Sequence, residues 1–159
     1  MCLVPRKRLI DRLNYSVIVI ALVVTAIDAL SKVWARHALA THAIHVGGAI
    51  WLRLQYNSGI SFSFNQSRTL LTTIATVIVA LVVVVLGLRA RRGLPTPGFG
   101  LLLGGGVANI VDRLSANPHQ VTDFIALGSF PVFNLADVAI TAGFITLLAA
   151  ALTGEKLLA

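Results

Sequence analysis

The chain has 159 residues, of which 57% are hydrophobic, and its mean hydropathy is +0.86. This composition is typical of a membrane protein built as one compact bundle, and it excludes an ordinary soluble domain. The net charge is +7, but no soluble basic domain exists to carry it, so we expect no nucleic-acid partner. Cys2 is the only cysteine, which excludes an intrachain disulfide.

Apolar stretches along the chain predict four membrane spans, because a hydrocarbon core of about 30 Å needs a helix of about 20 residues. The spans cover residues 15–34, 69–88, 97–114 and 132–153. The first also looks like a cleaved signal peptide, but its length favours a retained helix. The sequence therefore predicts an all-α membrane protein with four transmembrane helices.

Basic residues predict the orientation of these spans. They lie before the first span, between the second and third, and after the fourth, at Arg6, Lys7, Arg8, Arg12, Arg89, Arg91, Arg92 and Lys156. With four spans, all three groups of basic residues lie on the same side of the membrane. The positive-inside rule makes that side cytoplasmic. Residues 1–159 then form one domain, with a cytoplasmic tail at 1–13, outer segments at 35–68 and 115–131, and a cytoplasmic linker at 89–96.

The outer segment 35–68 contains two patterns of period two. Apolar and polar residues alternate over 50–57 and again over 60–65, with the turn signal Asn57-Ser58-Gly59 between them. We expect two short strands there, forming a small extracytoplasmic β-sheet at the membrane surface. The second outer segment contains the turn signals Asn117-Pro118 and Gly128, so we expect a loop that carries Asp123.

Acidic residues are rare, yet four of the six lie in or beside apolar stretches: Asp28, Asp112, Asp123 and Asp137. A carboxylate at membrane depth costs at least a few kcal/mol, so we expect the chain to use these groups. Asp28 and Lys32 are four residues apart and are predicted to form an ion pair on one helix face. That pair either only lowers the cost of burial or also anchors something near the outer surface.

Polar residues on the last two spans repeat one spacing. Asn109 shares a helix face with Asp112 and Arg113, and Asn134 precedes Asp137 by three residues. We expect Arg113 to pair with a carboxylate, because an unpaired guanidinium there is costly. Both polar faces end on the outer side, where Asp123 and Asp137 can meet. Two neighbouring carboxylates share a proton and can activate water, as in aspartic proteolysis.

Other chemistries lack their motifs. No His-Glu-x-x-His and no Gly-x-Ser-x-Gly occurs, so we expect neither a zinc nor a serine hydrolase, and no metal or cofactor. A proton-coupled transporter and a non-catalytic scaffold are the alternatives. The first is disfavoured because the polar residues gather at one surface. The second predicts that an Asn in place of Asp123 keeps the protein working.

Five motifs in order resemble lipoprotein signal peptidase, the signal peptidase II family of aspartic peptidases in bacterial inner membranes. They are DALSKVW at 28–34, YNSGISFS at 56–63, GGGVANIVDR at 104–113, VTDFI at 121–125 and FNLAD at 133–137. The resemblance covers residues 14–153. It departs from the family at Ala108, where glycine is usual, and after Asn57, where a pair of alanines is common. Neither change removes a polar group, so we expect activity.

The resemblance implies a role for each polar residue. Asp123 and Asp137 would be catalytic; Asn57, Asn109, Arg113 and Asn134 would bind substrate; and Asp28, Lys32, Asp112 and Gly105 would support the site. The substrate would be a diacylglyceryl-modified prolipoprotein, cut just before the lipid-modified cysteine. We expect a monomer among membrane lipids in the bacterial inner membrane, with both termini cytoplasmic and the active site near the extracytoplasmic surface.

Overall fold

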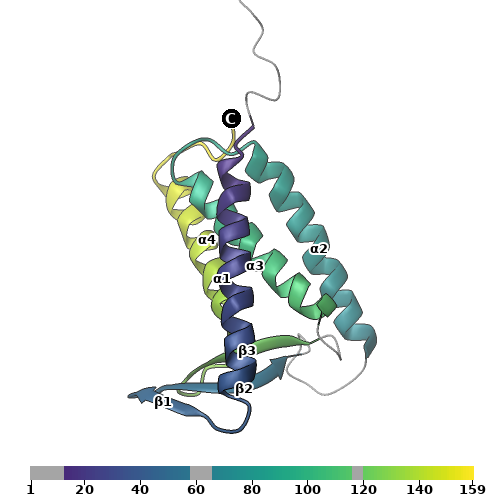
Figure 1. The fold of residues 1–159 in the computed structure, drawn as a ribbon. Helices are drawn as coiled ribbons and strands as arrows, with labels where there is room; N and C mark the ends of the chain where they lie inside the picture. Colours follow the sequence, from purple (N-terminus) through teal and green to yellow (C-terminus); the bar gives the residue numbers. More distant parts are fainter. Residues whose placement is uncertain (1–12, 58–65, 116–119) are drawn as a thin grey trace, which may run out of the picture.

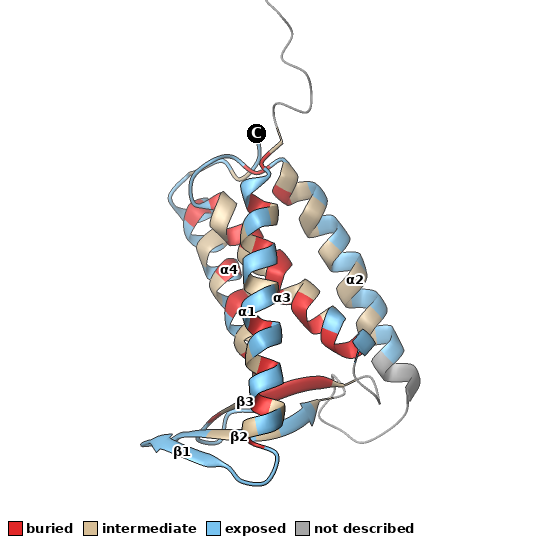
Figure 2. Ribbon diagram, in the orientation of Figure 1, coloured by how far each residue is buried: buried red, intermediate tan, exposed pale blue. Residues whose placement is uncertain are grey.

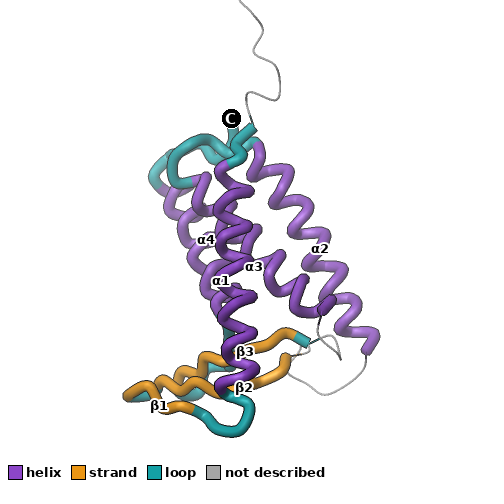
Figure 3. Tube along the Cα trace, in the orientation of Figure 1, coloured by secondary structure: helices purple, strands orange, loops and turns teal. Residues whose placement is uncertain are grey.

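A computed structural model describes residues 13–57, 66–115 and 120–159. Within the described residues, four helices and three strands follow one another in the chain: α1 (Ser16–Ala38), β1 (Ile44–Gly47), β2 (Ile50–Asn57), α2 (Gln66–Leu88), α3 (Pro95–Ser115), β3 (Val121–Leu127) and α4 (Leu135–Leu152). The helices form a bundle, and the sheet lies across one end of it (Figure 1). The loops that join the other ends of the helices, and the C-terminus, gather at the opposite end (Figure 3).

Three of the helices are long and apolar enough to cross a membrane. They are α1, the Leu70–Leu88 part of α2, and α4, with mean hydropathies of 2.1, 2.8 and 2.0. The prediction of a mostly helical membrane protein with a small sheet is thus confirmed in this coarser form. α3 is not among the three, because glycines, prolines and its polar end interrupt the apolar residues.

α3 lies in the middle of the bundle and packs against each of the other three helices. Its glycines allow this close approach, as the sequence predicted. A Cβ atom on Gly104 would lie 2.6 Å from Val24 Cβ and 2.8 Å from the Ala21 carbonyl oxygen on α1. A Cβ atom on Gly105 would collide with the Ala136 carbonyl oxygen on α4. The glycine run therefore lets α1 and α4 both pack closely against α3.

Burial follows this arrangement (Figure 2). Buried residues concentrate on α3 and β3, whereas the outward surfaces of α1, α2 and α4 are exposed and apolar. Only 6% of the apolar window of α2 is buried within the protein. Exposed apolar helix surfaces are what a lipid environment requires, because lipid tails solvate them.

The sheet has three antiparallel strands in the order β1-β2-β3. The strand predicted over 50–57 is confirmed as β2, and the one predicted over 60–65 lies outside the described residues. The prediction of a loop around Asp123 is wrong. Val121–Leu127 forms β3, and Gln55 of β2 pairs with Asp123. β3 is buried along most of its length, so it lacks the alternation of apolar and polar residues that marks a half-exposed strand.

Candidate active site

The ion pair predicted on the first span is confirmed and lies at the centre of a larger network. Lys32 Nζ lies 2.8 Å from Asp28 Oδ2, and both side chains are only 1% exposed. The same Nζ donates to Asn109 Oδ1 at 2.8 Å and lies 3.6 Å from Asp112 Oδ2. The second oxygen of Asp28 accepts the Ala136 N–H at 2.8 Å. The pair therefore joins α1 to both α3 and the first turn of α4.

Asp123 is buried in β3 and accepts a hydrogen bond on each carboxylate oxygen. Asn134 Nδ2 donates to Oδ1 at 2.6 Å, and Asn57 Nδ2 donates to Oδ2 at 3.0 Å. The antiparallel pairing of β2 and β3 explains the second contact, since it brings the last residue of β2 beside the strand that carries Asp123. The carboxylate is only 1% exposed, so its hydrogen bonds replace contacts with water.

Asp137 lies in the first turn of α4 and is half-buried. Asn109 Nδ2 donates to its Oδ1 at 2.9 Å, and the backbone N–H of Asn134 donates to its Oδ2 at 3.2 Å. Asn134 Oδ1 accepts the Asp137 N–H in return at 3.0 Å, which completes a capping box. The positive end of the helix dipole also favours a carboxylate at this position.

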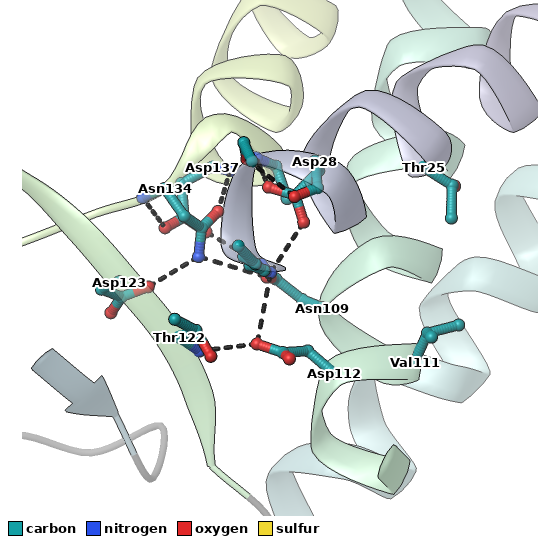
Figure 4. A network of polar contacts seen from close by, with 12 residues as sticks. Thr25, Asp28, Asn109, Val111, Asp112, Thr122, Asp123, Asn134 and Asp137 are labelled. Carbon is teal, nitrogen blue, oxygen red and sulfur yellow. Dashed lines mark hydrogen bonds and ion pairs between the residues drawn. The ribbon is translucent and has the colours of Figure 1, made fainter. Parts of the chain in front are cut away.

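Asn134 connects the two carboxylates, as Figure 4 shows. Its side chain donates to Asp123 and its backbone donates to Asp137, while the side chain is fully buried. The same Nδ2 lies 3.3 Å from Asn109 Oδ1. Asn109 and Asn134 thus both have their oxygen occupied by a donor, and each amide nitrogen points to a carboxylate. The structure therefore brings Asp123, Asp137 and three of the asparagines together at the sheet end of the bundle.

Burial raises the pKa of Asp123 from 3.8 to about 6, and the negative charge of Asp137 acts in the same direction. The hydrogen bonds from Asn57 and Asn134 and the positive charge of Lys32 oppose this rise. A carboxyl group with this pKa can hold or release a proton near neutral pH, which is the property that acid–base catalysis requires.

The remaining predicted residues surround this centre. Arg113 is 9% exposed, and its positive charge is attracted by Asp137, Asp123 and Asp112. Asp112 is buried and accepts the Thr122 N–H on Oδ2 at 2.6 Å. Gly105 lies against the first turns of α4, where its lack of a side chain makes room for the backbone that carries Asp137.

Two residues near the site were not predicted from the sequence. Arg36 Nη1 lies 3.0 Å from Asp112 Oδ1 and 3.1 Å from Thr122 Oγ1. Arg36 follows Lys32 by four residues, as Lys32 follows Asp28, so the three share one helix stripe. That spacing was the available signal for Arg36. Thr122 gave no signal, because its role depends on a strand that the sequence pattern does not reveal.

An open cavity of about 580 Å³ adjoins the Asp137 carboxylate. Asn57 and Asp137 form its polar edge, and its other walls are mostly apolar: Phe130, Pro131, Val132, Phe133, Val138, Thr141, Ala142 and Ile145. Because four of these residues lie along α4, the cavity extends from Asp137 along the side of that helix. Within the described parts of the chain, no group of three or more His, Cys, Asp or Glu side chains is arranged to hold a metal ion.

Comparison with known proteins gives consistent matches over most of the chain. The family model for Signal peptidase (SPase) II matches residues 20–153. The lipoprotein signal peptidase of Rhodococcus jostii (strain RHA1) is 39% identical over 147 residues, which cover 86% of this chain and 72% of that protein. The lipoprotein signal peptidase of Syntrophomonas wolfei subsp. wolfei (strain DSM 2245B / Goettingen) is 33% identical over 138 residues, covering 85% of this chain and 91% of that protein.

A solved structure has the same fold. It is a bacterial membrane enzyme determined by the in meso method at 2.3 Å resolution, with a TM-score of 0.72 and 25% sequence identity. The similarity covers 87% of this chain and 88% of that one. Fold, motifs and family model agree, and the chain therefore belongs to the signal peptidase II family, the membrane peptidases that remove signal peptides from lipoprotein precursors.

Proposed function

We propose that Asp123 and Asp137 are the catalytic pair with which this chain hydrolyses the signal peptide bond. The observation that carries the proposal is their shared contact with Asn134, which donates to both carboxylates from one buried position. Burial gives Asp123 a pKa of about 6, and Asp137 faces the cavity. A pair of carboxyl groups that differ in environment can divide the roles of acid and base between them.

The reaction needs one water molecule and one shared proton. Asp137, at the cavity edge, takes a proton from the water molecule while the water oxygen attacks the scissile carbonyl carbon. Asp123, whose protonated form is favoured by burial, donates its proton to the carbonyl oxygen. Asp137 then gives the proton it took from water to the amide nitrogen as the C–N bond breaks, and Asp123 takes a proton back from a hydroxyl group of the tetrahedral intermediate. This leaves a carboxyl group on the signal peptide, a free amine on the lipoprotein and both aspartates in their starting states.

The asparagines hold the pair in the geometry that this chemistry requires. Asn109 donates to Asp137, and Asn57 donates to Asp123 at the edge of the cavity. A peptide in the cavity lies within reach of Asn57, and Arg113 can meet its backbone or head-group oxygens. Asn57, Asn109, Arg113 and Asn134 thus orient the carboxylates and the peptide together.

The apolar part of the cavity suits the lipid of a diacylglyceryl-modified prolipoprotein. Val138, Ala142 and Ile145 line it on the α4 side, where an acyl chain can enter laterally from the bilayer. With the acyl chains there, the lipid-modified cysteine lies beside Asp137, which places the cleaved bond just before it. The polar edge and the apolar wall thus recognise the two halves of one substrate.

The same arrangement supports a specific position in the bacterial inner membrane. α3 acts as a fourth span, which tolerates its glycines and polar residues because the other helices surround it. Arg89, Arg91 and Arg92 lie at the end opposite the sheet, so both termini face the cytoplasm. The active site then lies near the extracytoplasmic surface, and the enzyme works as a monomer among lipids.

The test is cleavage of a lipidated prolipoprotein by the purified protein in detergent. Mass spectrometry should identify a product that begins with the lipid-modified cysteine. Asp123→Asn and Asp137→Asn should give no product, whereas Glu155→Gln, at the far end of the bundle, should cleave normally. Product from either Asn variant at the normal rate removes that residue from the catalytic pair, and cleavage at another bond contradicts the assigned position of the lipid.

A further inference from the structure

Arg36 lies in the last turn of α1 and connects that helix to the strand that carries Asp123. Its Nη1 lies 3.0 Å from Asp112 Oδ1 and 3.1 Å from Thr122 Oγ1, and its side chain is 32% exposed. No step of the proposed reaction uses Arg36. It is nonetheless a charged group that contacts two buried residues, one of which is the immediate neighbour of Asp123.

Thr122 is held from two directions. Asp112 Oδ2 accepts its backbone N–H at 2.6 Å, and Arg36 donates to its hydroxyl group. Figure 4 shows Thr122 against Asp112, next to Asp123 in the same strand. On its other edge β3 pairs with β2, where Thr122 is opposite Tyr56. Asp112 therefore binds the backbone of β3 at Thr122, before the point where Ile125 pairs with Phe133, and Arg36 holds the Thr122 side chain.

Arg36 and Lys32 share Asp112 as a partner. Lys32 Nζ is 2.8 Å from Asn109 Oδ1 but 3.6 Å from Asp112 Oδ2. Arg36 is closer to Asp112, at 3.0 Å, and so supplies the nearer positive charge. Without Arg36 the buried Asp112 carboxylate would draw the lysine toward itself, because an unpaired buried charge is costly. Asn109 would then lose the contact that directs its amide nitrogen toward Asp137.

We propose that Arg36 is a positioning residue for the cleavage reaction: it holds Asp112 and Thr122 so that β3 presents Asp123, and Lys32 and Asn109 present Asp137, in reactive geometry. This proposal rests on the assignment of Asp123 and Asp137 as the catalytic pair. Arg36 itself does not touch the substrate. Its effect reaches one carboxylate through Thr122 and the other through Lys32.

Arg36→Gln tests the proposal. It keeps a polar side chain of moderate length but removes the positive charge and the N–H donors of the guanidinium group. Misplacement of a reacting group by a fraction of an ångström to an ångström slows a reaction by roughly 10- to 100-fold. We therefore expect kcat on lipidated substrate to fall by about that factor while KM stays within about twofold, because the cavity walls are untouched. Arg36→Lys restores a positive charge and should recover part of kcat.

A double-mutant cycle tests the route through Thr122. Thr122→Val removes the hydroxyl group that Arg36 contacts, and the rate loss of the double variant should be smaller than the product of the two single losses. Arg53→Gln is the matched control, because this exposed arginine lies on β2, outside the polar network of the active site. It should cleave at the normal rate.

Specific activity is measured per folded molecule, with the folded fraction determined from the thermal transition in detergent. A purely structural role lowers Tm and leaves kcat per folded molecule unchanged, and that result overturns the proposal. If the rate loss of the double variant equals the product of the two single losses, Arg36 does not act through Thr122. Asp123→Asn in the same assay separates the two hypotheses. If it is inactive while Arg36→Gln is normal, only the positioning role fails, whereas an active Asp123→Asn refutes the catalytic pair itself.

Discussion

Asn134 offers the sharpest test of how the two carboxylates are held, because its side chain has two separable functions. Its Oδ1 accepts the Asp137 N–H at 3.0 Å as the cap of α4, and its Nδ2 donates to Asp123 at 2.6 Å. Asn134→Ser keeps a capping oxygen but is too short to reach Asp123. Asn134→Ala loses both functions, so the difference between the two variants isolates the cap.

The expected magnitudes follow from the contacts that each variant loses. A hydrogen bond to an ionised group contributes about 1.5–3 kcal/mol. Because about 1.4 kcal/mol corresponds to a factor of ten in rate, both variants should cleave about 10- to 100-fold more slowly. Loss of the cap costs about 1 kcal/mol more. Asn134→Ala should therefore melt about 2–4 °C below Asn134→Ser.

The pH dependence supplies a readout that loss of stability does not imitate. The bond from Asn134 favours the ionised form of Asp123, so its removal raises the pKa of Asp123 above its present value of about 6. The limb of the pH–rate profile that reports Asp123 should therefore move to higher pH in Asn134→Ser. The assay is single-turnover cleavage of lipidated substrate between about pH 5 and 9. A profile that stays in place or moves to lower pH refutes the assigned contact.

Three further predictions concern packing, metal dependence and topology. Gly105→Ala should lower Tm and activity because the new methyl group collides with the α4 backbone, whereas Gly106→Ala, which has no atom within 4 Å of its Cβ position, should be tolerated; equal Tm values contradict the packing. Cleavage should survive strong chelators, since the described residues contain no clustered ligand set, and loss of activity that zinc restores contradicts an aspartic mechanism. With Cys2 replaced, a membrane-impermeant thiol reagent added to intact cells should label Ala49→Cys in the turn between β1 and β2 and spare Leu94→Cys in the linker; the reverse pattern inverts the topology.

Local spacing in the sequence predicted the contacts within single elements. Asp28 and Lys32 pair as the four-residue spacing indicates, and Asn134 and Asp137 form the capping box that the three-residue spacing allows. The alternating pattern before Asn57 predicted β2. These features depend only on the geometry of one helix or one strand, so periodicity is sufficient to find them.

Contacts between distant segments were harder to predict. Asp28 reaches the backbone of Ala136, 108 residues away, and no local pattern encodes that contact. The strand around Asp123 was missed because it is buried, and turn residues on both sides favoured a loop. Arg36 was missed for a related reason, since its partner Thr122 lies on that strand. The predicted topology brought Asp123 and Asp137 to the same surface, and the motif resemblance gave them their catalytic roles.

The most direct test of the catalytic pair measures substrate binding and single-turnover cleavage separately for Asp123→Asn and Asp137→Asn. An Asn has nearly the shape of an Asp but cannot exchange the proton that the reaction requires. Each variant should therefore bind lipidated prolipoprotein within a few-fold of the normal affinity and lose cleavage by about a thousandfold or more, consistent with the loss of an essential acid or base. Normal cleavage by either variant, or loss of binding without loss of the chemical step, contradicts the assignment of these two aspartates as the groups that activate water.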